Sequence, residues 1–428
     1  MNRKFQFLKN RAVQNAGWLI GGRVIQMVIS LFVGLLTARY LGPSNYGLTG
    51  YAAAYTAFFT AFCTLGINSL LVKEFVDHPG EEGKIIGTAL GLRGVSSLLS
   101  SVLIVLIVLV LDAGESVTIW VVALTSLGLV FNIFETFNYW FQSKLESKVT
   151  AKATLIGYSV SAAYKVYLMI AGKSVVYFAL VSSLDYLCLA VVLLREYRRH
   201  QGGKLTFSWT YGKSLLARSR HFILPSLMVA IYGQTDKLML KQMISETEIG
   251  YYNTATTVCT MWCFVLAAII DSVYPSIMEA HKQGTELFER RNRQLYAMVF
   301  YISAVVAIGF TILGKPVIYI LYGRAYLPAV APLRIVTWYT AFSYLGVARN
   351  AWIVCEEKQK YLFPIYLSAA ASNVALNLLL IPRWGASGAA LASLTAQIIT
   401  TMVTPFFIKN IRRNSVLMLE AILLKGVR

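Results

Sequence analysis

The chain has 428 residues, of which 57% are hydrophobic and only 14% are charged. The apolar residues fall in blocks of about twenty, the length that crosses a bilayer core, and a soluble domain has no need of such blocks. The formal net charge of +19 fits basic loops beside anionic lipid and does not require a nucleic-acid partner.

The order of apolar blocks predicts an all-α integral membrane protein with about twelve transmembrane helices. Each block must be helical, because the backbone has no water to bond inside hydrocarbon. The expected spans are 16–36, 47–71, 83–111, 117–141, 150–171, 174–194, 218–243, 250–275, 294–320, 332–355, 361–381 and 387–408.

Lysine and arginine are distributed unevenly over the connections between these spans. The N-terminus, the even-numbered connections and the C-terminus hold most of the basic residues that lie outside spans. Because basic residues are retained on the cytoplasmic side, both termini are predicted to lie in the cytoplasm. The first apolar block follows a basic start but has the length of a full span and no evident cleavage site, so it is interpreted as a helix and not as a signal peptide.

The longest polar connection, 195–213, divides the spans six and six. It predicts an N-lobe at 1–204, a C-lobe at 205–414 and an amphipathic tail at 415–428. A shift of 203 residues lays Gly47 on Gly250, which suggests two pseudo-symmetric lobes with a substrate site where they face each other.

Five cations fall inside the expected spans and must face protein or water, because a charge at the bilayer centre is costly. One interpretation is a cavity that binds an anion such as phosphate or pyrophosphate; the other is a set of buried ion pairs. The candidate substrate-binding residues are Arg23, Arg93, Lys165, Lys237 and Arg349.

Arg23 is the strongest of these candidates, because helix-breaking residues occur at matching positions of the two halves. Gly21 and Gly22 precede Arg23, and the shift of 203 places Pro225 opposite Gly22. A loosened helix can expose backbone groups to a transport site; the alternative is a small-residue packing face that includes Gly17.

Acidic residues are also embedded in the expected spans. Asp236 and Glu135 are candidates for coupling to a proton or Na⁺, because burying a carboxylate is costly. No other cofactor and no metal site are expected: the four histidines lack ligand spacing, and the five cysteines all lie in apolar blocks. Residues 171–174 contain only the end of a phosphate-binding loop, so neither an ATPase nor another enzyme is expected.

Several motifs carry a family resemblance. Asn15 to Trp18 with Thr37 to Gly47, Asp236 to Leu240 with Glu248 to Tyr252, and Leu321 to Gly323 resemble segments of bacterial polysaccharide flippases. The closing region continues the likeness through Asn373, Asn377, Ile381, Pro382 and the run Gly385 to Ala390. The chain therefore resembles the Wzx-type O-antigen and capsule flippases of the MOP superfamily, which also holds lipid II flippases and MATE exporters.

The resemblance implies a protein of the bacterial inner membrane that moves an undecaprenyl-pyrophosphate-linked oligosaccharide to the outer leaflet by alternating access. Its implied partners are this lipid-linked substrate, membrane lipids, and the polymerase and glycosyltransferases of the same pathway. Two alternatives remain: an ion-coupled exporter of the MATE type, and a membrane polymerase or assembly factor of the polysaccharide pathway.

Overall fold

The computed structural model describes residues 2–200 and 202–426, with all side chains in these ranges except those of residues 2–16, 19, 20, 23, 69, 221 and 225. The described residues form helices and no strands. They group into two compact units. The first unit comprises residues up to Leu41 together with Tyr51–Ala230; the second comprises Gly42–Gly50 and the residues from Ile231 onward. The predicted lobe boundaries remain a prediction; the compact units assign 42–50 to the second unit and 205–230 to the first.

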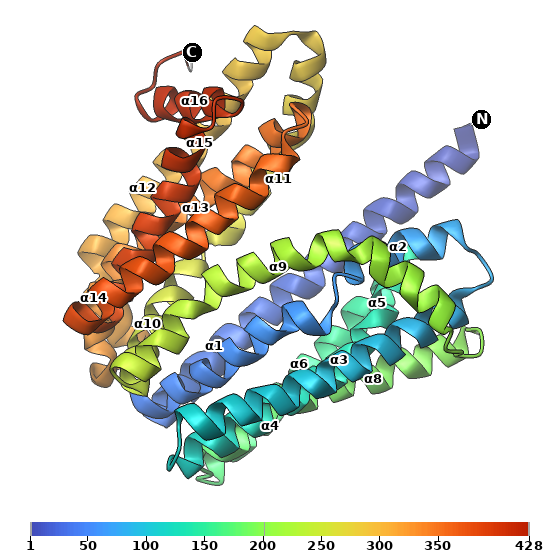
Figure 1. Cartoon of the computed structure of the whole chain (residues 1–428), viewed down its shortest axis with the longest axis horizontal. Helices are drawn as coiled ribbons and strands as arrows, with labels where there is room; N and C mark the ends of the chain where they lie inside the picture. Colours follow the sequence, from blue (N-terminus) through green and yellow to red (C-terminus); the bar gives the residue numbers. More distant parts are fainter. Residues whose placement is uncertain (1, 201, 427–428) are drawn as a thin grey trace. The chain divides into compact units, whose positions relative to one another are not determined.

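Two long helices are kinked (Figure 1). Residues of α1 (Asn2–Cys63) belong to both units, whereas α14 (Leu362–Ile398) lies entirely in the second unit. α1 kinks at Gly42, where φ is +71°, and α14 kinks at Gly385, where φ is +50°. Glycine adopts these backbone angles without the penalty that a Cβ atom would bring. Each kink lies between two expected spans and joins two helical segments end to end.

The first unit contains most of α1 and the helices up to the start of α9. Neighbouring pairs α3 and α4, α4 and α8, and α6 and α8 lie side by side, as Figure 1 shows. The remaining elements of this unit are α2 (Asn68–Asp77), α3 (Glu82–Leu111), α4 (Ser116–Asn132), the 3₁₀ turn η1 (Ile133–Glu135), α5 (Thr136–Ser143), α6 (Ser147–Ile170), α7 (Val175–Phe178) and α8 (Val181–Arg199).

The second unit holds the end of α9 (Trp209–Met243) and all later elements. α10 and α11 divide the expected span 250–275 at Met261 and Trp262. The elements that follow α9 are α10 (Glu246–Thr260), α11 (Cys263–Gln283), α12 (Thr285–Tyr322), η2 (Arg324–Ala329), α13 (Val330–Cys355), η3 (Gln359–Tyr361), α14, the π-helix η4 (Ile399–Val403), α15 (Thr404–Phe407) and α16 (Arg412–Ile422).

The surface of α3 shows the distribution of residues that a lipid environment selects. Val95, Leu99 and Val110 are exposed, whereas Arg93 and Ser97 on the same helix are buried. In water the apolar residues would be the buried ones. Eight helical stretches in the described residues are long and apolar enough to cross a membrane, which supports the predicted all-α membrane class; the total of twelve crossings remains a prediction.

α1 and α10 cross closely inside the second unit, and the residues at this crossing are related by the shift of 203 positions. A Cβ atom built on Gly47 would lie 1.7 Å from the Glu246 carbonyl oxygen, and one on Gly250 would lie 2.1 Å from the Pro43 carbonyl oxygen. Residues 43 and 246, like residues 47 and 250, are 203 positions apart. The contact is therefore reciprocal under the same shift that the sequence suggested, as expected at a local pseudo-twofold axis.

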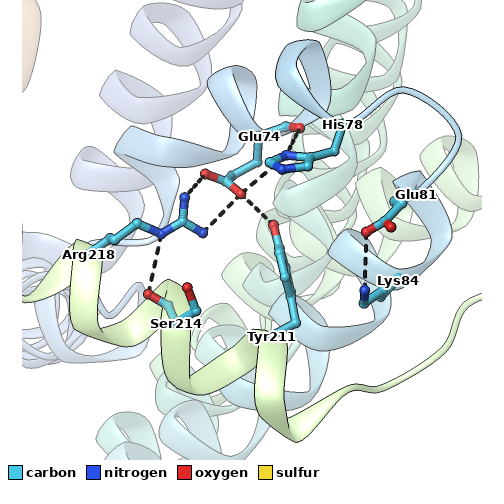
Figure 2. A network of polar contacts seen from close by, with 7 residues as sticks. All are labelled: Glu74, His78, Glu81, Lys84, Tyr211, Ser214 and Arg218. Atoms are coloured by element: carbon cyan, nitrogen blue, oxygen red, sulfur yellow. Dashed lines mark hydrogen bonds and ion pairs between the residues drawn. The ribbon is translucent and has the colours of Figure 1, made fainter.

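The start of α9 is fixed to α2 within the first unit by a cluster of polar side chains (Figure 2). The Glu74 carboxylate accepts hydrogen bonds from the Arg218 guanidinium at 2.5 and 3.1 Å and from the Tyr211 hydroxyl at 2.7 Å. His78 lies 3.8 Å from the same carboxylate. This cluster holds one end of α9, while the other end of α9 belongs to the second unit.

α16 begins at Arg412, before the predicted tail at 415–428, and ends inside that tail at Ile422. α16 buries Leu417 and Met418 in a cluster with residues of α12. Ion pairs of Arg413 with Glu289 and of Arg293 with Glu420 fix its polar face to α12.

Candidate functional site

Arg93, a predicted substrate-binding residue, is fully buried in the first unit. Its guanidinium donates to the Thr136 hydroxyl at 2.8 Å and to the Asn132 side-chain oxygen at 3.0 Å. Both acceptors stand beside η1, so Arg93 fixes α3 to the break between α4 and α5. The charge of Glu135 acts on this guanidinium from the same turn.

Arg349 occupies a comparable place in the second unit, with 2% of its surface exposed. It donates to the carbonyl oxygen of Thr400 at 3.1 Å. Thr400 lies in η4, where a π-helix leaves carbonyl groups without their usual α-helical partners. The guanidinium therefore supplies a donor to a carbonyl group that the π-helix leaves without its usual partner.

Asp236 is the centre of a dense polar network in the second unit. Its carboxylate accepts hydrogen bonds from the Tyr252 hydroxyl at 2.6 Å, Asn377 Nδ2 at 2.6 Å, Asn373 Nδ2 at 2.9 Å and the Ser393 hydroxyl. Four donors, one from α10 and three from the two arms of α14, thus converge on this α9 carboxylate, which is 4% exposed. These hydrogen bonds supply the partners that a buried carboxylate requires.

A cavity of about 160 Å³ opens beside this network. Lys237 lies on its wall next to Asp236, whose charge acts on the ammonium group. The other lining residues are Tyr232, Gly233, Tyr252, Thr256, Thr260, Val336, Tyr339, Thr340 and Ser393. Oxygen atoms dominate the polar lining, a chemistry that suits a proton or a hard cation such as Na⁺.

Glu135 and Lys165 belong to a second polar region, in the first unit. Glu135 lines a cavity of about 210 Å³ together with Asp185. Lys165 of α6 interacts electrostatically with Asp185 of α8. Each acid at this cavity thus has a nearby cation, Arg93 for Glu135 and Lys165 for Asp185.

The side chains of Arg23 and Pro225 lie outside the described residues. Beside Arg23, Gly21 and Gly22 line an apolar cavity of about 400 Å³ with Trp18. A Cβ atom on Gly17 or Gly21 would meet no described atom within 4 Å, whereas one on Gly22 would lie 3.2 Å from Ala151 Cβ. Gly22 therefore packs closely on α6, and Gly17 and Gly21 border open space.

The described candidates fall into separate groups. Arg93, Lys165 and Glu135 belong to the first unit, whereas Lys237, Asp236 and Arg349 belong to the second. Reasoning from the residues alone did not find Tyr252 or Ser393 as partners of Asp236. Asn373 and Asn377 could have been found from the sequence, because two amides four positions apart share one face of an apolar helix.

Comparison with known proteins relates the sequence and the fold of this chain to a capsular polysaccharide biosynthesis protein, a multidrug transporter and a flippase. The chain is 21% identical over 410 residues to the capsular polysaccharide biosynthesis protein CapF of Staphylococcus aureus, covering 93% of this chain and 100% of CapF. A multidrug resistance transporter of the MATE family and MOP superfamily, in an inward-facing conformation, matches with a TM-score of 0.71 and 13% identity over 92% of this chain and 95% of that one.

The lipid II flippase MurJ, in an inward closed conformation, matches with a TM-score of 0.69 and 16% identity over 95% of this chain and 92% of that one. At these identities the structures establish a shared fold, the all-α membrane fold that MATE transporters and MurJ adopt. The family model described as polysaccharide biosynthesis protein matches residues 12–281, more than half of the sequence. The chain belongs to the polysaccharide biosynthesis protein family.

Proposed function

We propose that this protein is a flippase that moves an undecaprenyl-pyrophosphate-linked oligosaccharide from the inner to the outer leaflet of the bacterial cytoplasmic membrane. The observation that carries the proposal is the fold of MATE transporters and of the flippase MurJ, over more than nine-tenths of the chain, in a member of a polysaccharide biosynthesis family. Such a protein changes the position of its substrate and makes or breaks no covalent bond.

The proposed pyrophosphate-binding residues are Arg23, Lys165 and Lys237. Lys165 and Lys237 are half-buried, and Lys237 lines the cavity beside Asp236. Arg93 and Arg349 are proposed to support the helix framework instead, because their guanidinium groups already hold Asn132, Thr136 and Thr400.

Asp236 is the proposed coupling site for Na⁺ or a proton. If the amides of Asn373 and Asn377 turn through 180°, their oxygens join the Asp236 carboxylate and the Ser393 hydroxyl as ligands. The Asn377 side-chain oxygen is buried and has no hydrogen-bond partner among the described residues. A cation at this position would satisfy that oxygen and neutralise the carboxylate.

The proposal includes the orientation and partners that the sequence suggests. Both termini would lie in the cytoplasm, where glycosyltransferases complete the substrate, and a polymerase would receive it at the outer surface. Basic residues in the cytoplasmic connections would then face anionic lipid.

A leaflet-specific assay in proteoliposomes tests the function. The purified chain is reconstituted with an undecaprenyl-pyrophosphate-linked oligosaccharide confined to one leaflet, and a membrane-impermeant glycosidase reports its arrival in the other leaflet. Transfer above protein-free vesicles is expected, with no change in glycan length. Elongation of the glycan by the purified chain would instead identify a polymerase.

An ion-coupled exporter of small cations is the second candidate, favoured by the Asp236 carboxylate that lines the polar cavity of the second unit. In everted vesicles an exporter would accumulate a fluorescent cation when a proton or Na⁺ gradient is imposed. A flippase would leave the cation distribution unchanged while still moving the lipid-linked glycan.

A further inference from the structure

The polar cavity of the first unit lies between helices of that unit. Residues from α1, η1, α5, α6 and α8 contribute to its wall, so it is formed by tertiary packing and not by one helix. The lining residues are Gln26, Glu135, Asn138, Thr154, Tyr158, Asp185, Tyr186 and Leu189. All but Leu189 carry a hydrogen-bonding group.

The cavity presents both hydrogen-bond donors and acceptors. Asn138 has a buried side-chain oxygen without a hydrogen-bond partner among the described residues, and leaving such an atom unsatisfied is costly. Gly157 makes room for Asp185, because a Cβ atom there would lie 2.8 Å from the Asp185 carboxylate. These features favour a polar occupant over an apolar one.

The charge around the cavity favours an uncharged occupant. Its two carboxylates, Glu135 and Asp185, are each offset by a cation, Arg93 and Lys165 respectively. An anion would lie against two carboxylates, and a cation would add a third positive charge to a balanced set. A neutral molecule with many hydroxyl groups disturbs this balance least.

The volume of the cavity favours a sugar ring over a single ion as its occupant. Its volume of about 210 Å³ equals the share of liquid volume of roughly seven water molecules. A single bare cation needs oxygen ligands at about 2.3–2.6 Å and would leave most of this space empty. A pyranose ring uses carboxylates and amides together, because each hydroxyl group both donates and accepts.

We propose that this cavity is a subsite for one uncharged sugar ring of the transported glycan, with Asn138, Thr154 and Asp185 as hydrogen-bonding partners of its hydroxyl groups. The inference rests on the proposed flippase function and specifies which chemical part of the substrate the first unit binds. It also predicts selectivity, because a uronic acid would bring a third carboxylate to the two already there.

Saturation-transfer difference NMR on the full chain in nanodiscs tests this subsite, since it detects weak binding and avoids detergents with sugar head groups. The probes are the methyl glycosides of glucose, galactose and N-acetylglucosamine, with methyl glucuronide as the acidic comparison. At least one neutral glycoside is expected to receive saturation, about fivefold more than the glucuronide.

The variants are Asn138→Ala combined with Thr154→Val and, as a milder change, Tyr158→Phe. Thr125→Val is the matched control, because Thr125 also lies in the first unit but does not line the cavity, and its hydroxyl donates to the Val121 carbonyl oxygen. The double variant should reduce saturation at least about fivefold, and the control should leave it unchanged. Should the double variant fail to fold, Tyr158→Phe should still lower saturation.

Three outcomes would overturn the subsite: no saturation of any neutral glycoside, equal saturation in the variants and the wild type, or equal saturation of the glucuronide. Failure of the subsite is distinguishable from failure of the flippase proposal. Transfer of the lipid-linked glycan by wild-type protein in the leaflet assay does not depend on the location of its sugar-binding groups.

Discussion

At the scale of single residues, buried charge in this protein is matched by local partners. Asp236 has four side-chain donors, and Arg93 has two side chains of its own unit. In a bilayer an unsatisfied charge is expensive, so these partners decide whether each residue supports the fold or remains able to bind an ion or substrate.

Asp236→Asn should remove the response of the protein to its coupling ion. Thermal stability in nanodiscs would be measured with Na⁺ and with choline at several pH values. Wild-type protein should be stabilised by Na⁺ or by a change of pH, since a ligand that binds only the folded state raises its stability. The variant should melt at the same temperature in Na⁺ and in choline at each pH, and a retained Na⁺ response would place the coupling ion elsewhere.

Arg93→Met should destabilise the first unit by about 3–5 kcal/mol, because the side chains that now accept from a buried guanidinium lose their donor. Lys165→Met should reduce transport with a smaller loss of stability. Thermal melting combined with the leaflet assay separates the two effects. A stable Arg93→Met protein without transport would return Arg93 to the substrate-binding set.

The Glu74 cluster should make the first unit sensitive to acid. Burial alone would raise the pKa of Glu74, but the hydrogen bonds from Arg218 and Tyr211 and the charges of Arg218 and His78 outweigh burial and lower it. A carboxyl group whose pKa is lower in the folded protein than in the unfolded chain stabilises the fold at pH values above the unfolded pKa of about 4.3. This stabilisation is lost as the pH falls through the folded pKa.

The melting temperature of the wild type should therefore fall below about pH 4 more steeply than that of Arg218→Ala. At pH 7 the variant should be less stable by about 1.5–3 kcal/mol, the contribution of a hydrogen bond to a charged group. Melting curves from pH 7 to pH 3 check both effects. Parallel curves for the two proteins would show that Glu74 does not govern the acid response.

The candidate site was only partly predictable from the residues. Hydropathy singled out Asp236 and Lys237 because embedded charges stand out in apolar blocks, and both line one cavity. It did not select Tyr252 or Ser393, because hydroxyl groups are ordinary in membrane helices. The same criterion also selected Arg93 and Arg349, since composition does not distinguish a buried framework cation from one that a substrate can reach.

At the scale of helices, kinks and close crossings position the polar residues. Gly42 and Gly385 adopt non-helical backbone angles that divide α1 and α14 into two segments each, and the expected spans lie on either side of each break. Apolar periodicity located these spans, but it did not indicate that residues 42–50 group with the second unit. That grouping depends on backbone contact between α1 and α10, which leaves little trace in hydropathy.

Gly47→Ala tests the crossing. A methyl group would have to occupy space 1.7 Å from the Glu246 carbonyl oxygen, so the helices must separate, at a cost of about 1–3 kcal/mol or more. Gly34→Ala is the matched control, because a Cβ atom there meets nothing within 4 Å. Equal melting temperatures for the two variants would contradict the close crossing.

At the scale of the whole molecule, the two units contain different polar chemistry. The first has a charge-balanced cavity lined by Glu135 and Asp185, and the second has the network centred on Asp236. A transporter that couples an ion to a large amphiphilic substrate needs both kinds of group, one for the ion and one for the polar part of the substrate. The sequence shift of 203 residues relates the reciprocal close contacts of Gly47 and Gly250 at the crossing of α1 and α10.

The transfer of a lipid-linked oligosaccharide between leaflets tests the central claim most directly. In the proteoliposome assay, wild-type protein should deliver the undecaprenyl-pyrophosphate-linked glycan to the impermeant glycosidase, and Arg23→Ala should abolish delivery in a protein that melts like the wild type. Folded wild-type protein that delivers no more glycan than empty vesicles, with or without an ion gradient, would contradict the account.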